Sequence, residues 1–391
     1  MTRTQVGIFG AGPAGLTLAH LLHREGIESV VLEHRSRDHV EQRIRAGVIE
    51  QAIADMLIDA GAGERLEREG IVHHGIELQF DGERHRIPLS ELTGGKAIVI
   101  YGQTEVVTDL ITIRLDADLP LLFEVEGVSL HDLDSERPTI RYAHEGVAQL
   151  LECDVVAGCD GYHGVCRPSI PAGVLREFTR EYPFGWLGIL AAVAPSNDEL
   201  VYSHHERGFA LLSLRSAELS RLYLQCRPDE DLAEWPDARI WQELQIRLGL
   251  EGWTLAEGPV LEKGVTGMRS YVAEPMRYGR LFLAGDAAHI VPPTGAKGLN
   301  LALHDVRLLA EALVSWFRTG RSELLDAYSA ACLRRVWRAE HFSWWMTSML
   351  HRLESDDDFG LKLQLSQLRY VTTSNAAATS LAENYVGLER V

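Results

Sequence analysis

The sequence is poor in basic residues relative to acidic ones, poor in cysteine, and lacks any long hydrophobic run. Lys and Arg together number 38 against 56 Asp and Glu, which gives the 391-residue chain a formal net charge of −18. Nucleic acids and anionic membrane surfaces bind proteins through positive charge, so this balance disfavours both as partners. No apolar stretch approaches the roughly 18 residues that a membrane-spanning helix needs. A small anionic ligand would have to be held by a local basic pocket.

The cysteines are too few and too irregularly placed to indicate a disulfide framework or a metal site. Their number is odd and they lack paired metal-ligand spacing, which predicts reduced, mostly buried thiols: Cys153, Cys159, Cys166, Cys226 and Cys332. The first residues run directly into a strand pattern, without the charged segment and apolar run of a secretory signal. These absences predict a soluble cytoplasmic protein whose length allows two or three domains.

A glycine-rich turn is the strongest positive signal. Residues 6–15 read VGIFGAGPAG, so a short apolar strand enters a G-x-G-x-x-G turn that an apolar helix pattern follows. A second strand, over residues 29–32, ends at Glu33. This spacing, with an acid about twenty positions after the glycines, predicts a βαβ unit that binds a dinucleotide.

Each residue of that unit has a physical role. Gly10 permits the tight turn, Gly12 lets a pyrophosphate approach the backbone, and Gly15 lets the helix lie close to the strand. The helix N-terminus offers unpaired N–H groups and the positive end of its dipole to phosphates. Glu33 is predicted to accept hydrogen bonds from the adenosine ribose.

The rest of the chain alternates strand and helix patterns. We predict an antiparallel hairpin over 75–88 that turns at Asp81-Gly82, and a sheet-rich insert from 178 to 224. The other predicted strands cover 99–101, 123–128, 139–142, 148–151, 155–157, 186–193, 200–203, 209–214, 221–225 and 281–284. Predicted helices cover 50–60, 103–115, 235–248, 305–317 and 324–350, whereas 361–379 follow no pattern.

Two carboxylates follow apolar strands, where ligands of α/β sheets bind. Asp160 ends one strand in Gly-Cys-Asp-Gly, and Asp286 ends another before a proline-rich turn. Arg45, in a basic segment near the first βαβ unit, either pairs with a pyrophosphate or lies in a solvated turn. The aromatic cluster of Trp337, Trp344 and Trp345 favours a core or dimer contact over a cofactor site.

With these motifs, the sequence resembles the flavin-dependent aromatic hydroxylases, which are single-component, FAD-containing monooxygenases. The likeness extends over nearly the whole chain. Beside the glycine-rich turn and Glu33, the matching segments are 43–47, 101–105, 158–161, 182–186, 285–300 and 383–387. G-x-G-x-x-G is shared by many flavoproteins, whereas Asp160-Gly161 together with Gly285-Asp286 marks the hydroxylase group.

The resemblance implies a mixed α/β fold with a Rossmann-like βαβ domain for FAD, a mixed-sheet substrate domain and a C-terminal helical region. Residues 1–72, 96–180 and 268–330 would form the FAD domain, 73–95 and 181–267 the substrate domain, and 331–391 the helical interface region. It also implies a homodimer, with NADPH or NADH and O2 as co-substrates.

Site residues are implied in the same way. For FAD, Asp286 would hold the ribityl chain, Arg45 the pyrophosphate and Gln103 the region between them. The turn from Pro293 through Leu299 and Asn300 would line the isoalloxazine ring. The positions that match those associated with NADPH are Arg43, His163 and Arg269. Arg35, with Arg37, could bind its 2′-phosphate, although His39 and Glu41 leave room for NADH.

The substrate residues implied by the resemblance lie mostly in the sheet-rich insert. Ser213, Arg215 and Tyr223 would hold a ring carboxylate, for which a bidentate guanidinium is well suited. Tyr202, Tyr385 and His73 would draw the phenolic proton toward solvent, which favours phenolate. Arg221 would lie beside the flavin, where a cation favours the reduced anionic form.

The function implied is hydroxylation of 4-hydroxybenzoate to 3,4-dihydroxybenzoate, through a flavin C4a-hydroperoxide that must be kept from water. A related ring acid, such as 3-hydroxybenzoate or an aminobenzoate, is an alternative because the same carboxylate clamp would serve it. A flavin-binding protein without turnover is the alternative from a different class.

Overall fold

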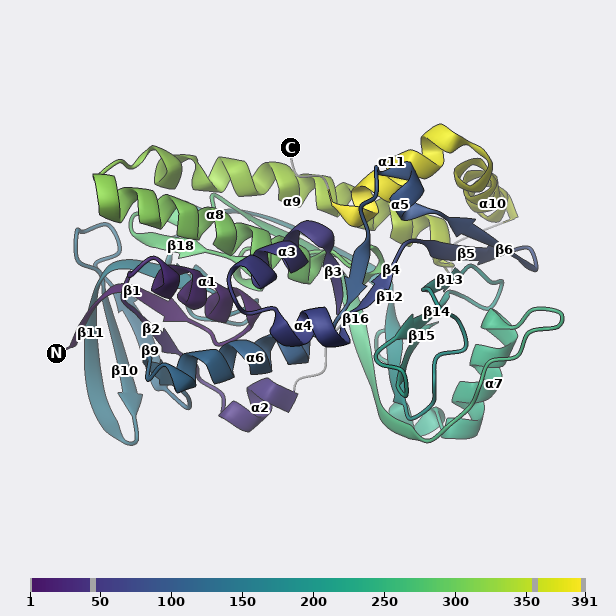
Figure 1. Cartoon of the computed structure of the whole chain (residues 1–391), viewed down its shortest axis with the longest axis horizontal. Coiled ribbons are helices and arrows are strands. Elements are labelled where there is room, and N and C mark those ends of the chain that lie inside the picture. The colour runs from purple at the N-terminus through teal and green to yellow at the C-terminus, as the bar shows by residue number, and fades with distance from the viewer. Residues whose placement is uncertain (1, 43–46, 354–357, 388–391) are drawn as a thin grey trace.

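Two large β-sheets, joined by a pair of long strands, organise the molecule (Figure 1). The computed structural model describes residues 2–42, 47–353 and 358–387. The first sheet has the strand order β17-β18-β11-β1-β2-β8, extended by β10 and β9, and the second has the order β19-β16-β12-β15-β14-β13-β5-β6. A small third sheet, β3-β7-β4, completes the described strands.

The first sheet contains the predicted βαβ unit. β1 (Thr2–Phe9) pairs in parallel with β2 (Ser29–Leu32) and with β11 (Val147–Gly158), so Phe9 lies beside Leu32 and Gly158. Helix α1 (Pro13–Arg24) connects β1 to β2, and its apolar face is buried. Because parallel strands end at one edge, the glycine-rich turn lies beside Glu33 and the segment after Gly158.

Other elements on this side cover or extend the sheet. Their bounds are α2 (Arg37–Gln42), β3 (Val48–Glu50), α3 (Gln51–Asp59), α4 (Glu64–Glu69), β4 (Ile71–His73), β7 (Ile98–Ile100), α6 (Gln103–Asp116), β8 (Leu121–Leu122), β9 (Glu126–His131), β10 (Thr139–His144), η1 (Arg167–Ser169), β17 (Arg277–Tyr278), β18 (Leu281–Leu283), η3 (Gly285–Ala287) and α8 (Gly298–Thr319).

The second sheet carries the sheet-rich insert. Its elements are β5 (Ile76–Phe80), β6 (Glu83–Ile87), α5 (Leu89–Leu92), β12 (Arg176–Ala191), β13 (Val201–Ser203), β14 (Ala210–Leu214), β15 (Ser220–Cys226), η2 (Leu232–Glu234), α7 (Asp237–Leu248), β16 (Val260–Glu274), β19 (His289–Ile290) and η4 (Pro293–Gly295). β12 and β16 pair along most of their length and run from one half of the molecule into the other.

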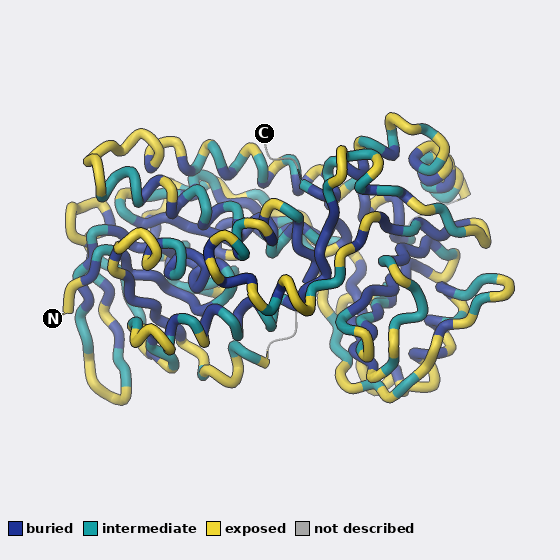
Figure 2. The backbone as a smooth tube through the Cα atoms, viewed as in Figure 1, coloured by how far each residue is buried: buried dark blue, intermediate teal, exposed yellow. Residues whose placement is uncertain are grey.

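Three helices follow α8. α9 (Glu323–Leu350) contributes Tyr328 and Cys332 to the core beneath the first sheet, and Phe342 and Met346 to the core of the second. α10 (Asp358–Thr373) and α11 (Asn375–Val386) pack against the second sheet and α5. Figure 2 shows the buried backbone continuing through both sheets and the strands that join them.

The predicted fold class is confirmed, and most predicted elements lie within a few residues of the observed ones. The strand predicted over 123–128 is shifted, because β9 begins at Glu126. The strands predicted over 148–151 and 155–157 are one continuous strand, β11. No strand was predicted at β16. Residues 361–379, for which no pattern was found, form most of α10 and the start of α11, within the C-terminal region that the resemblance implied to be helical.

Several of the predicted domain boundaries fall inside regular elements, whereas the one between residues 95 and 96 lies in the loop between α5 and β7. The boundary after residue 180 lies in β12, the one after 267 in β16, and the one after 330 in α9. The register of β12 against β16 shifts between Glu181 and Gly185, around Pro183, as expected where proline interrupts a ladder. The two halves therefore share continuous strands.

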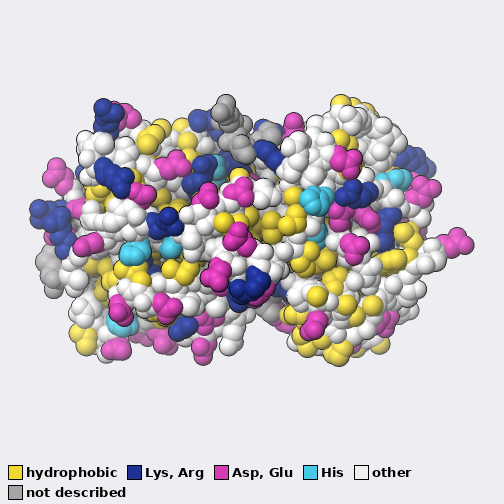
Figure 3. All heavy atoms as spheres, viewed as in Figure 1, with side chains coloured by type: hydrophobic (Ala, Val, Ile, Leu, Met, Phe, Trp, Pro, Cys, Tyr) yellow, Lys and Arg dark blue, Asp and Glu magenta, His cyan; other side chains and the backbone are white. Residues whose placement is uncertain are grey.

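Four of the cysteines are buried, as predicted, and Cys226 is half-buried. Within the described ranges, no helix is long and apolar enough to cross a membrane, and no cluster of His, Cys, Asp and Glu could hold a metal ion. Acidic and basic side chains are interspersed over the face in Figure 3.

Candidate active site

The glycine-rich turn is shaped by close backbone contacts. Gly10 has φ +107°, and a Cβ there would lie 2.3 Å from the Cys159 carbonyl oxygen. At Gly15 a Cβ would lie 2.0 Å from the Gly10 carbonyl oxygen, so neither position accepts a side chain. Nothing lies within 4 Å of a Cβ on Gly12. The turn is therefore tight where it meets the protein and open at Gly12, which fits the approach of a pyrophosphate.

The surroundings of this turn also suit a dinucleotide. Helix α1 begins with Pro13 and has no side-chain cap, so its N-terminal N–H groups remain for a ligand. The Glu33 carboxylate accepts hydrogen bonds from the N–H groups of Ala11 and Arg35, each at 2.8 Å. These bonds fix the acid at the end of β2. Arg45 and Arg43, predicted to hold phosphates, lie outside the described residues.

The strand-end carboxylates differ in their surroundings. Asp286 is exposed in the short η3 turn after β18. Asp160 instead accepts a hydrogen bond from the Cys166 N–H at 2.8 Å, and a Cβ on Gly164 would lie 2.0 Å from its carboxyl carbon. Burial raises the pKa of Asp160. Asp160 therefore organises its own loop, whereas Asp286 is available to a ligand.

The segment predicted to line the flavin ring is held in place by the hydrogen bonds of a buried asparagine, Asn300. Pro293 is exposed and Leu299 half-buried, whereas Asn300 is buried. The Asn300 amide donates to the carbonyls of Val48 at 3.0 Å and Ala296 at 2.9 Å. Its oxygen accepts from the Glu50 N–H at 2.8 Å. The Asn300 side chain thus holds the segment in place, while Pro293 and Leu299 remain partly open. Gln103, the first residue of α6, is half-buried.

Most of the predicted substrate residues share one face of the second sheet. Tyr202 pairs with Leu211, which pairs with Tyr223, and Ser213 pairs with Arg221. Since paired residues and residues two apart point to the same side of a sheet, these side chains form a continuous patch. Because β13, β14 and β15 pair antiparallel in succession, two turns of the chain bring Tyr202 and Tyr223 onto this common face.

The arginines of this patch are partly desolvated. Arg221 donates from Nε to the Tyr223 hydroxyl at 3.3 Å, and a Cβ on Gly188 would lie 2.9 Å from its guanidinium, so the glycine makes room for it. Arg215 follows β14 and donates to the Thr104 hydroxyl at 3.2 Å near the start of α6. Burial lowers the pKa of Arg215. A bound anion would offset the cost of burying the positive charge of Arg215.

Tyr202 and Tyr385 are joined directly. Their hydroxyl oxygens lie 2.5 Å apart, and both residues are only 1% exposed. Burial raises the pKa of both phenols, which keeps each neutral and able to donate and accept. His73 is buried, and burial lowers its pKa to about 4. Its ring nitrogens have no hydrogen-bond partner among the described residues, so the structure does not join it to Tyr385.

A buried ionic cluster next to Tyr385 was not singled out from the sequence. Lys297 donates from Nζ to Glu50 at 2.7 Å and to the Tyr385 carbonyl at 2.7 Å, and Arg335 also pairs with Glu50. Glu50 is 2% exposed, in a short apolar strand. The sequence signal was therefore an acid at a core position, which needs partners. The cluster therefore connects the end of α11 to β3 and to the residue that precedes α8.

Two of the residues assigned to NADPH surround Tyr162. The His163 ring lies edge-on to Tyr162 at 5.0 Å, and the Arg269 guanidinium lies 4.9 Å from the centre of the Tyr162 ring. Arg35 is exposed after β2, and no contact joins it to that group among the described residues. The structure therefore brings His163 and Arg269 together.

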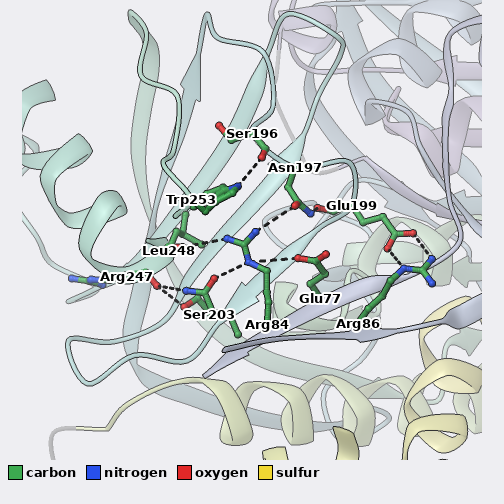
Figure 4. Close-up of polar contacts among 11 residues, drawn as sticks. Glu77, Arg84, Arg86, Ser196, Asn197, Glu199, Ser203, Arg247, Leu248 and Trp253 are labelled. Carbon is green, nitrogen blue, oxygen red and sulfur yellow. Dashed lines mark hydrogen bonds and ion pairs between the residues drawn. The ribbon is translucent and has the colours of Figure 1, made fainter. Parts of the chain in front are cut away.

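A polar network supports the strand that carries Tyr202 (Figure 4). Arg84 stacks on Trp253 at 4.2 Å and donates to the Leu248 carbonyl at 3.3 Å. Ser203 donates to the Arg247 carbonyl at 2.5 Å. These contacts tie β6 and β13 to the end of α7, which fixes the position of Tyr202 beside its neighbouring strands.

Comparison with known proteins shows the family and the fold of this chain. The model of the FAD binding domain family matches residues 3–343. The p-hydroxybenzoate hydroxylase of Acinetobacter baylyi is 49% identical over 387 residues, covering 99% of this chain and 96% of that protein. The kynurenine 3-monooxygenase of Salinispora tropica is 25% identical, over 84% of this chain and 76% of that protein. The crystal structure of p-nitrophenol 4-monooxygenase PnpA from Pseudomonas putida shares the fold with a TM-score of 0.85 at 20% identity, over 100% of both chains.

Proposed function

Because this chain belongs to the FAD binding domain family of single-component aromatic hydroxylases, we propose that it converts 4-hydroxybenzoate to 3,4-dihydroxybenzoate. It is an FAD-dependent monooxygenase. The reaction consumes O2, one NAD(P)H and one proton, and releases NAD(P)⁺ and water beside the hydroxylated ring. The relative from Acinetobacter baylyi, matched over nearly the full length of both chains, supports this substrate over 3-hydroxybenzoate or an aminobenzoate.

FAD, when bound, supplies the redox chemistry: it accepts electrons from NAD(P)H and delivers activated oxygen to the ring. The open backbone at Gly12 and the uncapped start of α1 would hold its pyrophosphate, and Glu33 its ribose. Asp286 would bind the ribityl chain from the exposed turn. Pro293 and Leu299 would line the ring system. Gly12 and Glu33 follow strands of the first sheet, Asp286 lies in η3, Pro293 in η4, and Leu299 in the first turn of α8.

The observation that carries the proposal is the shared sheet face and its direct link to Tyr385. Arg215, with Ser213 and Tyr223, would bind the ring carboxylate and so fix the ring in one orientation. Tyr202 would then receive the phenolic hydroxyl at the opposite end of the ring. The 2.5 Å bond from Tyr202 to Tyr385 gives that proton a first step away from the substrate. Phenolate formation makes the ring carbon ortho to the oxygen more nucleophilic.

Beyond Tyr385 we assign His73 to the exit of the proton. Burial keeps the imidazole neutral, with a pKa of about 4, so it can accept at one nitrogen while it donates at the other. A bridging water would connect it to Tyr385. Arg221, beside Tyr223 and with one buried nitrogen unpaired in the described chain, would favour negative charge on the reduced flavin.

For the nicotinamide co-substrate, Arg269 offers a guanidinium and His163 an imidazole, both packed against Tyr162. Arg35 and Arg37, exposed after β2, would bind a 2′-phosphate and so favour NADPH over NADH. Arg43 is assigned to the same co-substrate from the sequence.

The aromatic groove on α9 supports a homodimer. Trp337 and Trp344 lie seven residues apart on α9 and are 40% and 39% exposed. They border a cavity of about 320 Å³ between α9 and the β12–β16 pair, where Trp337 contacts Phe178 at 5.2 Å. Large aromatic side chains that are this exposed are typical of interfaces. Sedimentation should show a dimer, which Trp344→Glu converts to monomer; a wild-type monomer would contradict this.

One experiment tests the function. The protein loaded with FAD is given O2, NADPH or NADH, and 4-hydroxybenzoate, 3-hydroxybenzoate or 4-aminobenzoate in turn, and both oxygen uptake and the ring product are followed. We expect 3,4-dihydroxybenzoate in near-equal amount to the NAD(P)H consumed. Faster flavin reduction and better product yield with either other ring acid would refute the substrate assignment.

A further inference from the structure

A buried carboxylate and imidazole lie directly beneath the turn that carries Asp286. His289 donates from Nε2 to Asp305 Oδ2 at 2.6 Å, and their side chains are 2% and 1% exposed. The same oxygen accepts the backbone N–H of Gly285 at 3.0 Å. One carboxylate oxygen therefore connects α8, the turn η3 and the strand β19.

The turn has little freedom once these bonds form. Gly285 adopts φ +62°, and a Cβ there would lie 3.1 Å from the Ala302 Cβ and 3.6 Å from the Ala14 Cβ. Ala302 and Asp305 are three residues apart on α8 and so lie on one face of that helix. Gly285 is thus held against α8 through its N–H, while the next residue, Asp286, is directed to the exposed side.

From this geometry we propose that Asp305 and His289 are positioning residues for FAD. By holding the Gly285 N–H inward, they set the direction in which the Asp286 carboxylate meets the ribityl chain. The inference rests on the proposed role of Asp286. It assigns a function to residues that lie beneath the cofactor edge and that do not themselves reach the surface.

The chemistry of the pair explains how each member stabilises the other. A carboxylate at this depth is costly unless an opposite charge and hydrogen bonds compensate it. Burial lowers the pKa of His289, but the Asp305 carboxylate outweighs burial and the net shift is upward, which favours the charged imidazolium. The second oxygen of Asp305 has no hydrogen-bond partner in the described chain. The turn is therefore held by the two hydrogen bonds that Oδ2 accepts, from the Gly285 N–H and from His289.

Asp305→Asn and His289→Gln test the proposal, with FAD affinity measured by flavin fluorescence on titration of the apoprotein. Asp305→Asn removes the charge that strengthens both bonds, and we expect the Kd for FAD to rise about 10- to 100-fold. His289→Gln keeps a donor near the position of Nε2, and we expect a smaller rise, of a few-fold.

A matched control separates positioning from general loss of stability. Glu243 is another buried carboxylate, paired with Arg247 at 3.0 Å within α7 of the second sheet's side. Glu243→Gln should lower the Tm of the apoprotein and leave the Kd for FAD unchanged. Because a ligand stabilises the folded state by RT ln(1 + [L]/Kd), a higher Kd gives a smaller gain, and the rise in Tm on adding FAD should shrink for Asp305→Asn and not for Glu243→Gln.

The outcomes distinguish this inference from the proposed function. If the wild-type protein fails to bind FAD, the cofactor site itself is wrong. If the wild type binds FAD and both folded variants bind it equally well, the positioning role is refuted. If both variants fail to fold as apoproteins, the pair is a determinant of the core rather than of the cofactor turn, which also overturns the proposal.

Discussion

Replacing Tyr202 by Phe tests the proton path at its first step. The hydroxyl removed is 2.5 Å from that of Tyr385, in a site where both side chains are 1% exposed. A hydrogen bond to a charged oxygen contributes about 1.5–3 kcal/mol, and one pKa unit corresponds to about 1.36 kcal/mol. The neutral phenol loses a weaker bond of about 0.5–1.5 kcal/mol, and the pKa shift reports the difference of about 1–1.5 kcal/mol, so the pKa of the bound phenol should rise by about 1 unit in Tyr202→Phe.

Binding should change much less than ionisation. For the neutral phenol, the lost bond is worth about 0.5–1.5 kcal/mol, so the Kd for 4-hydroxybenzoate should rise by about 2- to 10-fold. The carboxylate clamp at Arg215 is untouched. The yield of hydroxylated product per NAD(P)H should fall, since a less ionised ring is a poorer nucleophile and activated oxygen is then lost as peroxide.

The assay is an absorbance titration of the bound phenol with pH, run beside product yield. Tyr328→Phe is the matched control: its hydroxyl is equally buried and donates to the Leu283 carbonyl at 2.8 Å, away from the substrate face. It should lose stability without changing the phenol pKa. Wild-type ionisation and yield in Tyr202→Phe, or an equal pKa shift in Tyr328→Phe, would refute the reasoning.

Three further outcomes follow from the structure. Arg215→Ala should raise the Kd for 4-hydroxybenzoate by about 10- to 100-fold, measured by flavin fluorescence, and change the Kd for phenol, which lacks the carboxylate, much less; equal losses for both would remove Arg215 from the clamp. Arg269→Ala should raise the KM for NAD(P)H while FAD affinity stays constant, and an unchanged KM would contradict its assignment. Burial raises the pKa of Glu340 to about 7, so the folded state holds a proton that the unfolded state releases above its ordinary pKa near 4.5. Stability should therefore decline between about pH 4.5 and 7, by up to about 3 kcal/mol, and Glu340→Gln should melt higher than the wild type at pH 8 and similarly at pH 5; parallel pH profiles would refute this.

Elements with strong local signals were predictable from the sequence. The turn at Gly10, Gly12 and Gly15 was found because the spacing of its glycines is a local pattern, although the contact that excludes a side chain at Gly10 comes from the distant Cys159. The hairpin was found from its Asp81-Gly82 turn and from the alternation of apolar and polar residues in β5. Both patterns lie within a short stretch of the sequence, and the structure contains both elements.

Elements whose burial is decided by distant segments were missed or misplaced. β16 alternates poorly, because its first half, paired with β12 in the second sheet, is largely exposed, whereas its last residues are buried and α9 packs against the strand. α10 has only three buried residues, so its apolar period is weak. Pro183 lies inside β12, where the register shift accommodates it. In each case the environment along one element changes with its tertiary neighbours.

The residues of the candidate site fall into the same two groups, those that local spacing identifies and those that tertiary contacts place. The sequence determined by itself that a dinucleotide turn exists, that Glu33 ends its second strand, and which residues match a hydroxylase pattern, because these are properties of local spacing. Only the tertiary structure decided that Asp286 faces outward, since Asp305 on α8 holds the N–H of the preceding Gly285 inward. Asp160 instead accepts from the nearby Cys166 N–H and turns into its own loop.

Long-range pairing was beyond any local pattern. Tyr202 and Tyr385 are 183 residues apart and meet only because α11 packs beside the second sheet. Asp305 was not singled out from the sequence, where it only begins a predicted helix, and its bonds to Gly285 and His289 depend on how α8 lies under the turn. A buried polar group needs hydrogen-bonding or charged partners, and the packing of distant elements determines which residues these are.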